Sequence, residues 1–175
     1  MKTAFRTFAA LAALTVVGSA GAATTISSSI SVTASISASC TFAATPSTAA
    51  AFGAYDPTSG TANDAGVGTI TARCTKNTGY TMALGVGSGA GAAYATGRIM
   101  TGAVYGDLLN YNLYTTAGRT VVWGDGTGAT ATRSGTGTGI GVAFNQTLSV
   151  YGRIPVGQDL SADSYADTVT IDLTY

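Results

Sequence analysis

Hydrophobic and polar residues alternate with a period of two over residues 24–38. Side chains of a β-strand point alternately to opposite faces, so this pattern predicts a strand with one apolar and one hydroxyl-rich face. The segment contains no Gly, Pro or charged residue. Its apolar face must be buried against another surface, and we expect that surface to lie outside the segment's own domain. The residues on this face are Ile26, Ser28, Ile30, Val32, Ala34, Ile36 and Ala38.

The end of the chain repeats the pattern. Within residues 164–175, polar and apolar side chains alternate from Thr168 to the final residue. We therefore predict a second amphipathic strand that ends at Tyr175. Its polar face carries Thr and Asp side chains, and its apolar face carries Val169, Ile171, Leu173 and Tyr175.

Between these segments, short apolar runs are separated by turn residues. Residues 43–66 and 87–97 are predicted loops, and 76–79 is a predicted hairpin turn. The Gly-rich run 124–141 fits either a flexible hairpin or a strand packed closely against another surface. About seven strands separated by such turns predict an all-β fold, an immunoglobulin-like β-sandwich. The predicted strands are 40–42, 67–74, 80–86, 98–101, 109–114, 120–123, 140–151 and 164–175, with 152–155 leaving the sheet at an edge.

The chain begins with the three parts of a secretory signal peptide. Lys2 and Arg6 supply positive charge, residues 8–17 form an apolar run too short to span a bilayer, and residues 20–22 are small. We predict cleavage after residue 22 and export of a soluble chain. The predicted organisation is a signal peptide at 1–22, an N-terminal extension at 23–38 and one domain at 39–175.

Composition narrows the possible functions. The chain contains no His and no Glu, which removes Ser-His-Asp and Cys-His catalysis and the usual zinc sites. Without residues 1–22, six basic residues face eight Asp, a net charge of −2, and no basic cluster suited to nucleic acid remains. Most Asp residues adjoin Gly, Asn, Pro or Ser, as turn residues do. We expect a structural or binding protein without catalytic residues, metal or cofactor.

Two cysteines, Cys40 and Cys74, are present. In an exported chain, two cysteines most simply form one disulfide, worth about 3–4 kcal/mol for a closed loop of this length. A metal site built on them would lack the further Cys or His ligands that zinc prefers. We predict the Cys40–Cys74 disulfide.

Several stretches together resemble a known family. They are LNYNLY at 109–114, RTVVWGDG at 119–126, VYGRIP at 150–155 and the ending at 164–175, in company with the two cysteines. In combination they resemble the spore coat protein U domain family, which includes the pilin subunits of archaic chaperone–usher pili. The resemblance covers essentially all of the chain after residue 22. It implies an incomplete, pilin-type sandwich that lacks its last strand and is completed by a donated strand.

The resemblance also implies partners and site residues. A periplasmic pilus chaperone would fill the open groove first, and at an outer-membrane usher the extension of the next pilin copy would replace it. The chain would pass through the periplasm and end at the cell surface, in a pilus that supports adhesion and biofilm formation. The implied donor residues are Ile26, Ile30, Val32, Ala34 and Ile36. The implied groove wall and chaperone contact is Val169, Ile171, Leu173 and Tyr175.

Other interpretations stay open at this point. The chain could be a secreted monomeric β-sandwich, a coat or binding protein that uses residues 24–38 to complete its own fold. A role in spore or cyst coats is suggested by the family name, and a secreted hydrolase ranks last. The discriminating question is whether the N-terminal strand pairs with its own domain or with another copy.

Overall fold

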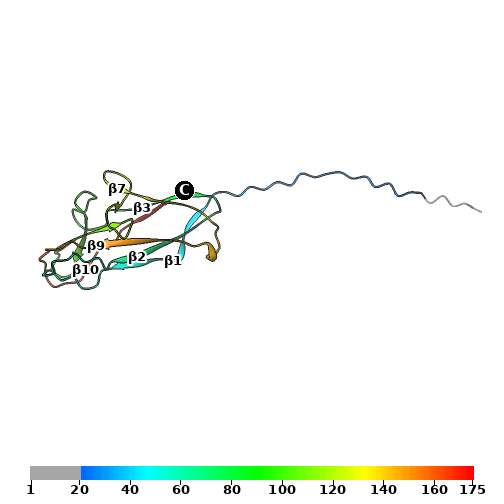
Figure 1. Cartoon of the computed structure of the whole chain (residues 1–175). Helices are drawn as coiled ribbons and strands as arrows, with labels where there is room; N and C mark the ends of the chain where they lie inside the picture. Colours follow the sequence, from blue (N-terminus) through cyan, green and yellow to red (C-terminus); the bar gives the residue numbers. More distant parts are fainter. Residues whose placement is uncertain (1–20) are drawn as a thin grey trace, which may run out of the picture. The chain divides into compact units, whose positions relative to one another are not determined.

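The computed structural model describes residues 21–175, without the side chains of residues 44–47. The chain divides into two units, Met1–Ser35 and Ile36–Tyr175. The second unit is a body made of strands (Figure 1). Of the predicted signal peptide, residues 1–20 lie outside the described range. Within that range, no helix has the length and apolar character needed to cross a membrane.

The body consists of short strands joined by turns, with one 3-10 turn, η1 (Val142–Phe144). Antiparallel pairing links most neighbours, and β6 with β7 is the parallel pair. The strands are β1 (Cys40–Ala51), β2 (Val67–Cys74), β3 (Gly79–Leu84), β4 (Arg98–Gly102), β5 (Leu108–Tyr114), β6 (Val122–Trp123), β7 (Thr130–Ala131), β8 (Arg133–Thr136), β9 (Gln146–Arg153), β10 (Tyr165–Ala166) and β11 (Ile171–Thr174).

These strands form two sheets around one core. The larger sheet has the order β1-β2-β9-β5-β4-β10, with β6 beside β5 and β7 beside β6. The smaller sheet has the order β11-β3-β8. Because buried side chains of β2, β5 and β9 pack with those of β3 in a single cluster, the sheets face each other as a sandwich. The predicted all-β, immunoglobulin-like fold is confirmed.

Burial alternates along the central strands as their sequences predict. The inward positions are at most 6% exposed, whereas their neighbours are more accessible to solvent on most of these strands. The inward faces are Ile70, Ala72 and Cys74 on β2, Tyr80, Met82 and Leu84 on β3, and Leu109, Tyr111 and Leu113 on β5.

The predicted hairpin at 76–79 is wrong. β2 pairs with β1 and β9, whereas β3 pairs with β11 and β8, so the connection carries the chain from one sheet to the other. Asn77 takes the left-handed backbone conformation, with φ 64°, and donates its N–H to the carbonyl of Gly137. A hairpin and a crossing between facing sheets use the same turn residues, and both bury one face of each strand. The local pattern therefore does not distinguish them.

Strand β1 is longer than predicted and replaces part of the expected loop at 43–66. Its register shifts between Phe42 and Ser47 and again between Thr48 and Ala51. Irregular pairing of this kind on an edge strand tolerates Pro46, whose nitrogen cannot donate to a ladder. The turn residues in this stretch were therefore compatible with a strand.

Strand β9 differs from the prediction at both ends. It begins at Gln146, because residues 142–144 form η1 instead of continuing the strand. It also lies between β2 and β5, so residues 152–155 do not leave at a sheet edge. Pro155 is tolerated because it follows the last residue of the strand.

The Gly-rich run contains β7 and β8 and is closely packed. β8 pairs with β3, and a Cβ added at Gly135 would collide with the ring of Tyr80. A Cβ added at Gly137 would meet the carbonyl of Thr75. Of the two interpretations of this run, the closely packed strand is the one observed.

Residues 21–39 form neither helix nor strand. The strand predicted at 24–38 is therefore absent from this chain, because a strand needs a hydrogen-bonded neighbour and no described residue pairs with the segment. Its large apolar side chains are almost fully exposed: Ile26 93%, Ile30 88%, Val32 85% and Ile36 90%.

Candidate functional site, an apolar groove beside the last strand

Each sheet of the body has an open edge. β11 pairs with β3 on one side, and β1 pairs with β2 on one side. Within the described residues, neither strand has a partner on its other side. The backbone N–H and C=O groups along such an edge can accept a further strand.

A groove of about 900 Å³ lies between the two open edges. Residues 48–55 of β1 and the following loop line one side, and Val169 and Ile171 line the other. Its floor is the core itself, where the Phe52 and Tyr111 rings meet edge to face with centroids 6.0 Å apart. The apolar side chains along the groove are Phe52, Ile70, Leu84, Met100, Leu109, Tyr111, Leu113, Val150, Ile154, Leu160, Tyr165, Val169 and Ile171.

The ring of Phe52 is seated on glycines. A Cβ added at Gly66 would lie 2.5 Å from the ring, and one added at Gly152 would also collide with it. Gly152 donates its N–H to the carbonyl of Gly66, which brings the two backbones together under the ring. Larger residues at these positions would push Phe52 into the groove and reduce its volume.

The four residues predicted for the groove wall have different environments. Val169 and Ile171 line the groove, and Leu173 packs half-buried against the core without lining it. Tyr175 is 58% exposed. Burial alternates along the last strand, because Ile171 and Leu173 are half-buried whereas Asp172 is exposed.

The predicted disulfide is confirmed. Cys40 and Cys74 are bonded, pairing the first residue of β1 with the last residue of β2. Cys74 is fully buried. Just outside, Thr75 donates its N–H to the carbonyl of Ser39 at 2.9 Å, so the pairing continues one residue toward the extension. The extension therefore joins the body at a covalently fixed point.

A carboxylate, Asp167, anchors the segment before β11. It accepts hydrogen bonds from the N–H and hydroxyl of Ser88, the N–H of Thr168 and the phenol of Tyr111, at 2.7–2.8 Å. Burial favours its neutral form, but these bonds outweigh that effect and hold the pKa of Asp167 below its usual value. Burial, reinforced by Asp167, raises the pKa of Tyr111, so the phenol remains a donor.

A buried guanidinium, Arg98 on β4, connects the ends of β3 and β6 with β5. It is 0% exposed, and in the described residues no carboxylate lies within ion-pair distance of it. Burial lowers its pKa. Its donors bond instead to the carbonyls of Gly85 at 2.8 Å, Leu84 at 3.3 Å and Trp123 at 2.7 Å, and to the Asn112 amide oxygen at 2.9 Å.

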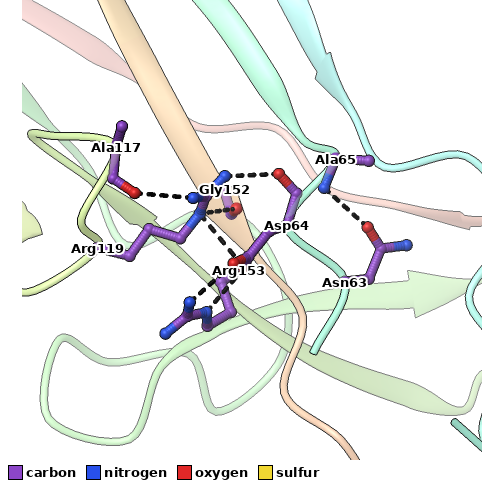
Figure 2. A network of polar contacts seen from close by, with 7 residues as sticks. All are labelled: Asn63, Asp64, Ala65, Ala117, Arg119, Gly152 and Arg153. Atoms are coloured by element: carbon purple, nitrogen blue, oxygen red, sulfur yellow. Dashed lines mark hydrogen bonds and ion pairs between the residues drawn. The ribbon is translucent and has the colours of Figure 1, made fainter. Parts of the chain in front are cut away.

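A second polar cluster lies outside the groove lining (Figure 2). Arg153 donates two hydrogen bonds to the Asp64 carboxylate at 2.7 and 2.8 Å, and this contact lowers the pKa of Asp64. Arg119 approaches the same carboxylate at 3.3 Å and donates to the carbonyls of Gly152 and Ala117. Because these groups bond to one another, the cluster fastens the loop before β2 to β9 and to the turn after β5.

No group of three or more metal-ligating side chains occurs among residues 21–175. The chemistry that the groove offers is therefore apolar contact together with the free backbone groups of a strand edge. Such a site suits an extended peptide with alternating apolar side chains.

The model of the Spore Coat Protein U domain matches residues 26–172. The chain belongs to the spore coat protein U domain family. The match begins inside the extension and ends in β11, so it includes most of both alternating segments. The resemblance noted in the sequence is confirmed.

Two known proteins are similar to parts of this spore coat protein U domain. Protein U of Myxococcus xanthus is 31% identical over 114 residues, which are 63% of this chain and 60% of the relative. The crystal structure of the CsuC-CsuE chaperone–tip adhesion subunit pre-assembly complex, from archaic chaperone–usher Csu pili of Acinetobacter baumannii, matches with a TM-score of 0.48 and 19% identity. That match covers 80% of this chain and 40% of the other chain.

For this spore coat protein U domain, sequence analysis named two residues that line the groove but missed its floor and its anchors. The floor draws on β2, β3, β4, β5 and β9 and on residues outside the strands. Its sequence signal was the alternation of β2, β3 and β5, which shows burial but not which core residues border a cavity. Asp167 was named only as part of the family stretch at 164–175, and no anchoring role was predicted for it. Arg98 had no signal, because its partners are mainly backbone carbonyls.

Proposed function

We propose that this chain is a structural subunit of an extracellular pilus assembled through a periplasmic chaperone and an outer-membrane usher, and that it polymerises by donor-strand exchange. Residues 24–38 of one copy occupy the apolar groove of the next. One observation carries the proposal: within residues 21–175, an exposed alternating segment pairs with nothing, and a strand edge beside an apolar groove is also unpaired. Membership of a family that includes pilins supports it.

The fit between segment and groove is physical. Strand addition at the free edge of β11 satisfies the backbone groups of both partners, and alternate side chains enter the groove. Ile26, Ile30, Val32 and Ile36, with the small Ala34, supply those side chains, and the hydroxyl face stays in solvent. Burial of each large aliphatic side chain contributes about 1.5–3 kcal/mol.

Donation to another copy is favoured over self-complementation. Residues 24–39 contain no Gly, Pro, Asn or Asp, the residues that most readily reverse a chain. The carbonyl of Ser39 already accepts a bond from Thr75, which continues the direction of β1. A segment without turn residues is poorly suited to reverse its direction, which favours its donation to another copy.

The same features explain the partners. An uncovered apolar groove beside a free strand edge is an aggregation hazard, and a chaperone that fills it removes the hazard until assembly. A head-to-tail contact that does not close produces a filament. The resulting pilus serves adhesion and biofilm formation at the cell surface, and the role is structural, without catalysis.

The first test removes the donor. The chain and a variant lacking residues 23–37 are each co-expressed with the pilus chaperone. We expect both to be recovered folded on the chaperone and only the complete chain to form polymers with the usher. A truncated variant that is unfolded in the chaperone complex would instead show that the segment belongs to its own domain.

The second test changes one face of the donor. Ile30→Asp places an unpaired carboxylate in the groove at a cost of several kcal/mol, so we expect polymer formation to fall by about 100-fold or more. The matched control, Ser31→Asp, adds the same charge on the neighbouring, solvent-facing position and should leave polymer formation within a few-fold of the unmodified chain. Equal effects of the two substitutions would contradict the assignment of the faces.

A further inference from the structure

We propose that consecutive subunits meet at a second surface: the apolar cluster Ile140, Val142 and Phe144 of one copy packs on the β4–β5 turn of the next, at Val104 and Tyr105. The inference rests on the proposed donor-strand function and specifies which surfaces of two copies come together beside the donated strand.

The cluster is exposed and lies in an uncharged stretch. Ile140 is 64% exposed, Val142 73% and Phe144 48%, so three apolar side chains within five residues face solvent. Residues 134–152 contain no charged side chain. Burying this surface against another copy therefore desolvates no charge of its own.

Short contacts fix the cluster beside the point where the extension joins the body. The Cα atoms of Cys40 and Cys74 are 4.1 Å apart, and Gly139 donates its N–H to the carbonyl of Cys74 at 3.1 Å. The ring of Phe144 lies against Gly139, where an added Cβ would be 2.8 Å from it. The cluster is thus part of the same rigid end of the sandwich as the disulfide.

The donor segment acts as a short tether. Ile36 and Cys40 are four Cα–Cα steps apart in the chain, and a fully extended chain of that length spans at most ~14 Å. When Ile36 lies in a neighbour's groove, the disulfide end of the donating body must therefore lie close to the rim of that groove. An apolar surface at this end is held near the neighbour at a high effective concentration.

The requirement for an open filament determines which end of the accepting subunit lies next to the disulfide end of the donating subunit. The last strand ends near the disulfide end, since Thr174 pairs with Thr81 just after the start of β3, and it begins toward the opposite end, where β10 lies (Figure 1). If the donating body lay at the disulfide end of its acceptor, the disulfide ends of the two copies would face each other. Each copy could then donate its extension to the other, which would give a closed dimer instead of a filament. Open growth requires entry at the β10 end.

The β4–β5 turn projects from this β10 end. Ala103 donates its N–H to the carbonyl of Ser164, and the N–H groups of Val104 and Tyr105 bond to the Asp163 carboxylate at 2.7 and 3.1 Å. These contacts hold the turn next to residues that line the groove. Val104 is nevertheless 76% and Tyr105 66% exposed, so the turn presents a pre-organised apolar surface to the arriving body.

Photo-crosslinking in assembled pili tests the contact directly. Val142 is replaced by p-benzoylphenylalanine in the complete chain, with Val121, another exposed apolar residue, as the matched control position. We expect light-dependent cross-links from position 142 to the 102–106 turn of a second copy, located by mass spectrometry, and none to that turn from position 121. Pili in which position 142 yields no cross-link to this turn would overturn the contact and leave donor-strand exchange intact.

A second measurement uses pilus stiffness. The double substitution Ile140→Ser and Val142→Ser, and separately Tyr105→Ser, should lower the bending persistence length in electron micrographs several-fold while polymer yield and chaperone binding stay unchanged. Combining the two should add little, because both remove one contact, and Val121→Ser should have no effect. Unchanged stiffness in the cluster and turn variants would overturn the inference, and absence of any polymer from the unmodified chain would overturn the proposed function together with it.

Discussion

Two segments of this chain have nearly the same sequence pattern and opposite structural fates. Residues 24–38 and the last strand both alternate apolar and polar side chains. The last strand pairs with β3 and packs Val169, Ile171 and Leu173 against the core. The N-terminal segment pairs with no described residue, and its Ile and Val side chains are 85–93% exposed.

Alternation therefore specifies which face of a segment is buried in a strand pair, but it does not specify which strand becomes the partner. Both segments satisfy the same local requirement, one buried face in a ladder. Only the second finds its partner within the 36–175 body. Under the proposed function, the first finds an equivalent partner in another copy, where it would lie beside the last strand.

The substitution with the largest predicted effect is in the body, at Arg98, and should not affect the extension. Arg98→Met removes the side-chain donor from the carbonyls of Gly85 and Trp123, and we expect a loss of about 3–5 kcal/mol in the free energy of unfolding. Chemical denaturation of the chaperone-free body measures it. Arg98→Lys, which keeps the charge but loses the planar fork, should fall in between.

If Arg98→Met left the stability unchanged, the polar anchoring of the groove would be wrong. Arg98 contacts the body and not residues 24–38. This variant should therefore lose the ability to accept a donor strand, while its own residues 24–38 should still enter the groove of an unmodified subunit. Mixing variant and unmodified subunits measures the two abilities separately.

A matched pair of substitutions tests the comparison itself. Ile171→Ala removes half-buried aliphatic atoms from the last strand, and we expect a loss of about 1–3 kcal/mol in the stability of the subunit. Ile30→Ala removes the same atoms from the exposed segment and should leave the thermal unfolding midpoint unchanged. In polymers, both substitutions should be destabilising. A destabilised monomer with Ile30→Ala would show that the segment is buried in its own chain.

The smallest expected effect concerns pH. The folded-state pKa of Asp167 lies below its usual value, so its ionisation stabilises the body above about pH 4 and this contribution is lost as the pH falls through the folded-state pKa. Asp167→Asn should therefore be less stable than the unmodified chain at pH 7, with the difference shrinking toward pH 3. Thermal unfolding across that range measures it.

A difference that is constant with pH would contradict this role of Asp167. Other Asp residues with lowered pKa values, such as Asp64, will contribute to acid unfolding of both proteins, which is why the difference between the two is the quantity to follow. Residues 24–38 contain no titratable side chain, so the extension itself should show no such dependence.

Much of the body could be predicted because its signals are local. The alternation on β2, β3 and β5 placed their buried faces correctly, and two cysteines in a chain predicted to be exported indicated one disulfide. The errors share a cause. The 76–79 turn, the length of β1 and the interior position of β9 depend on which strands are neighbours, and turn or glycine residues carry no information about that choice.

From the sequence alone came the strand faces, the pairing of Cys40 with Cys74, the family, and an alternating N-terminal segment whose apolar face needs a partner. The folded structure was needed to show that β11 has a free edge among residues 21–175, that a groove of about 900 Å³ opens beside it, and that Arg98 and Asp167 anchor neighbouring segments. The physical reason is that side-chain periodicity is written along one strand, whereas edges, grooves and buried polar contacts arise between strands far apart in the chain.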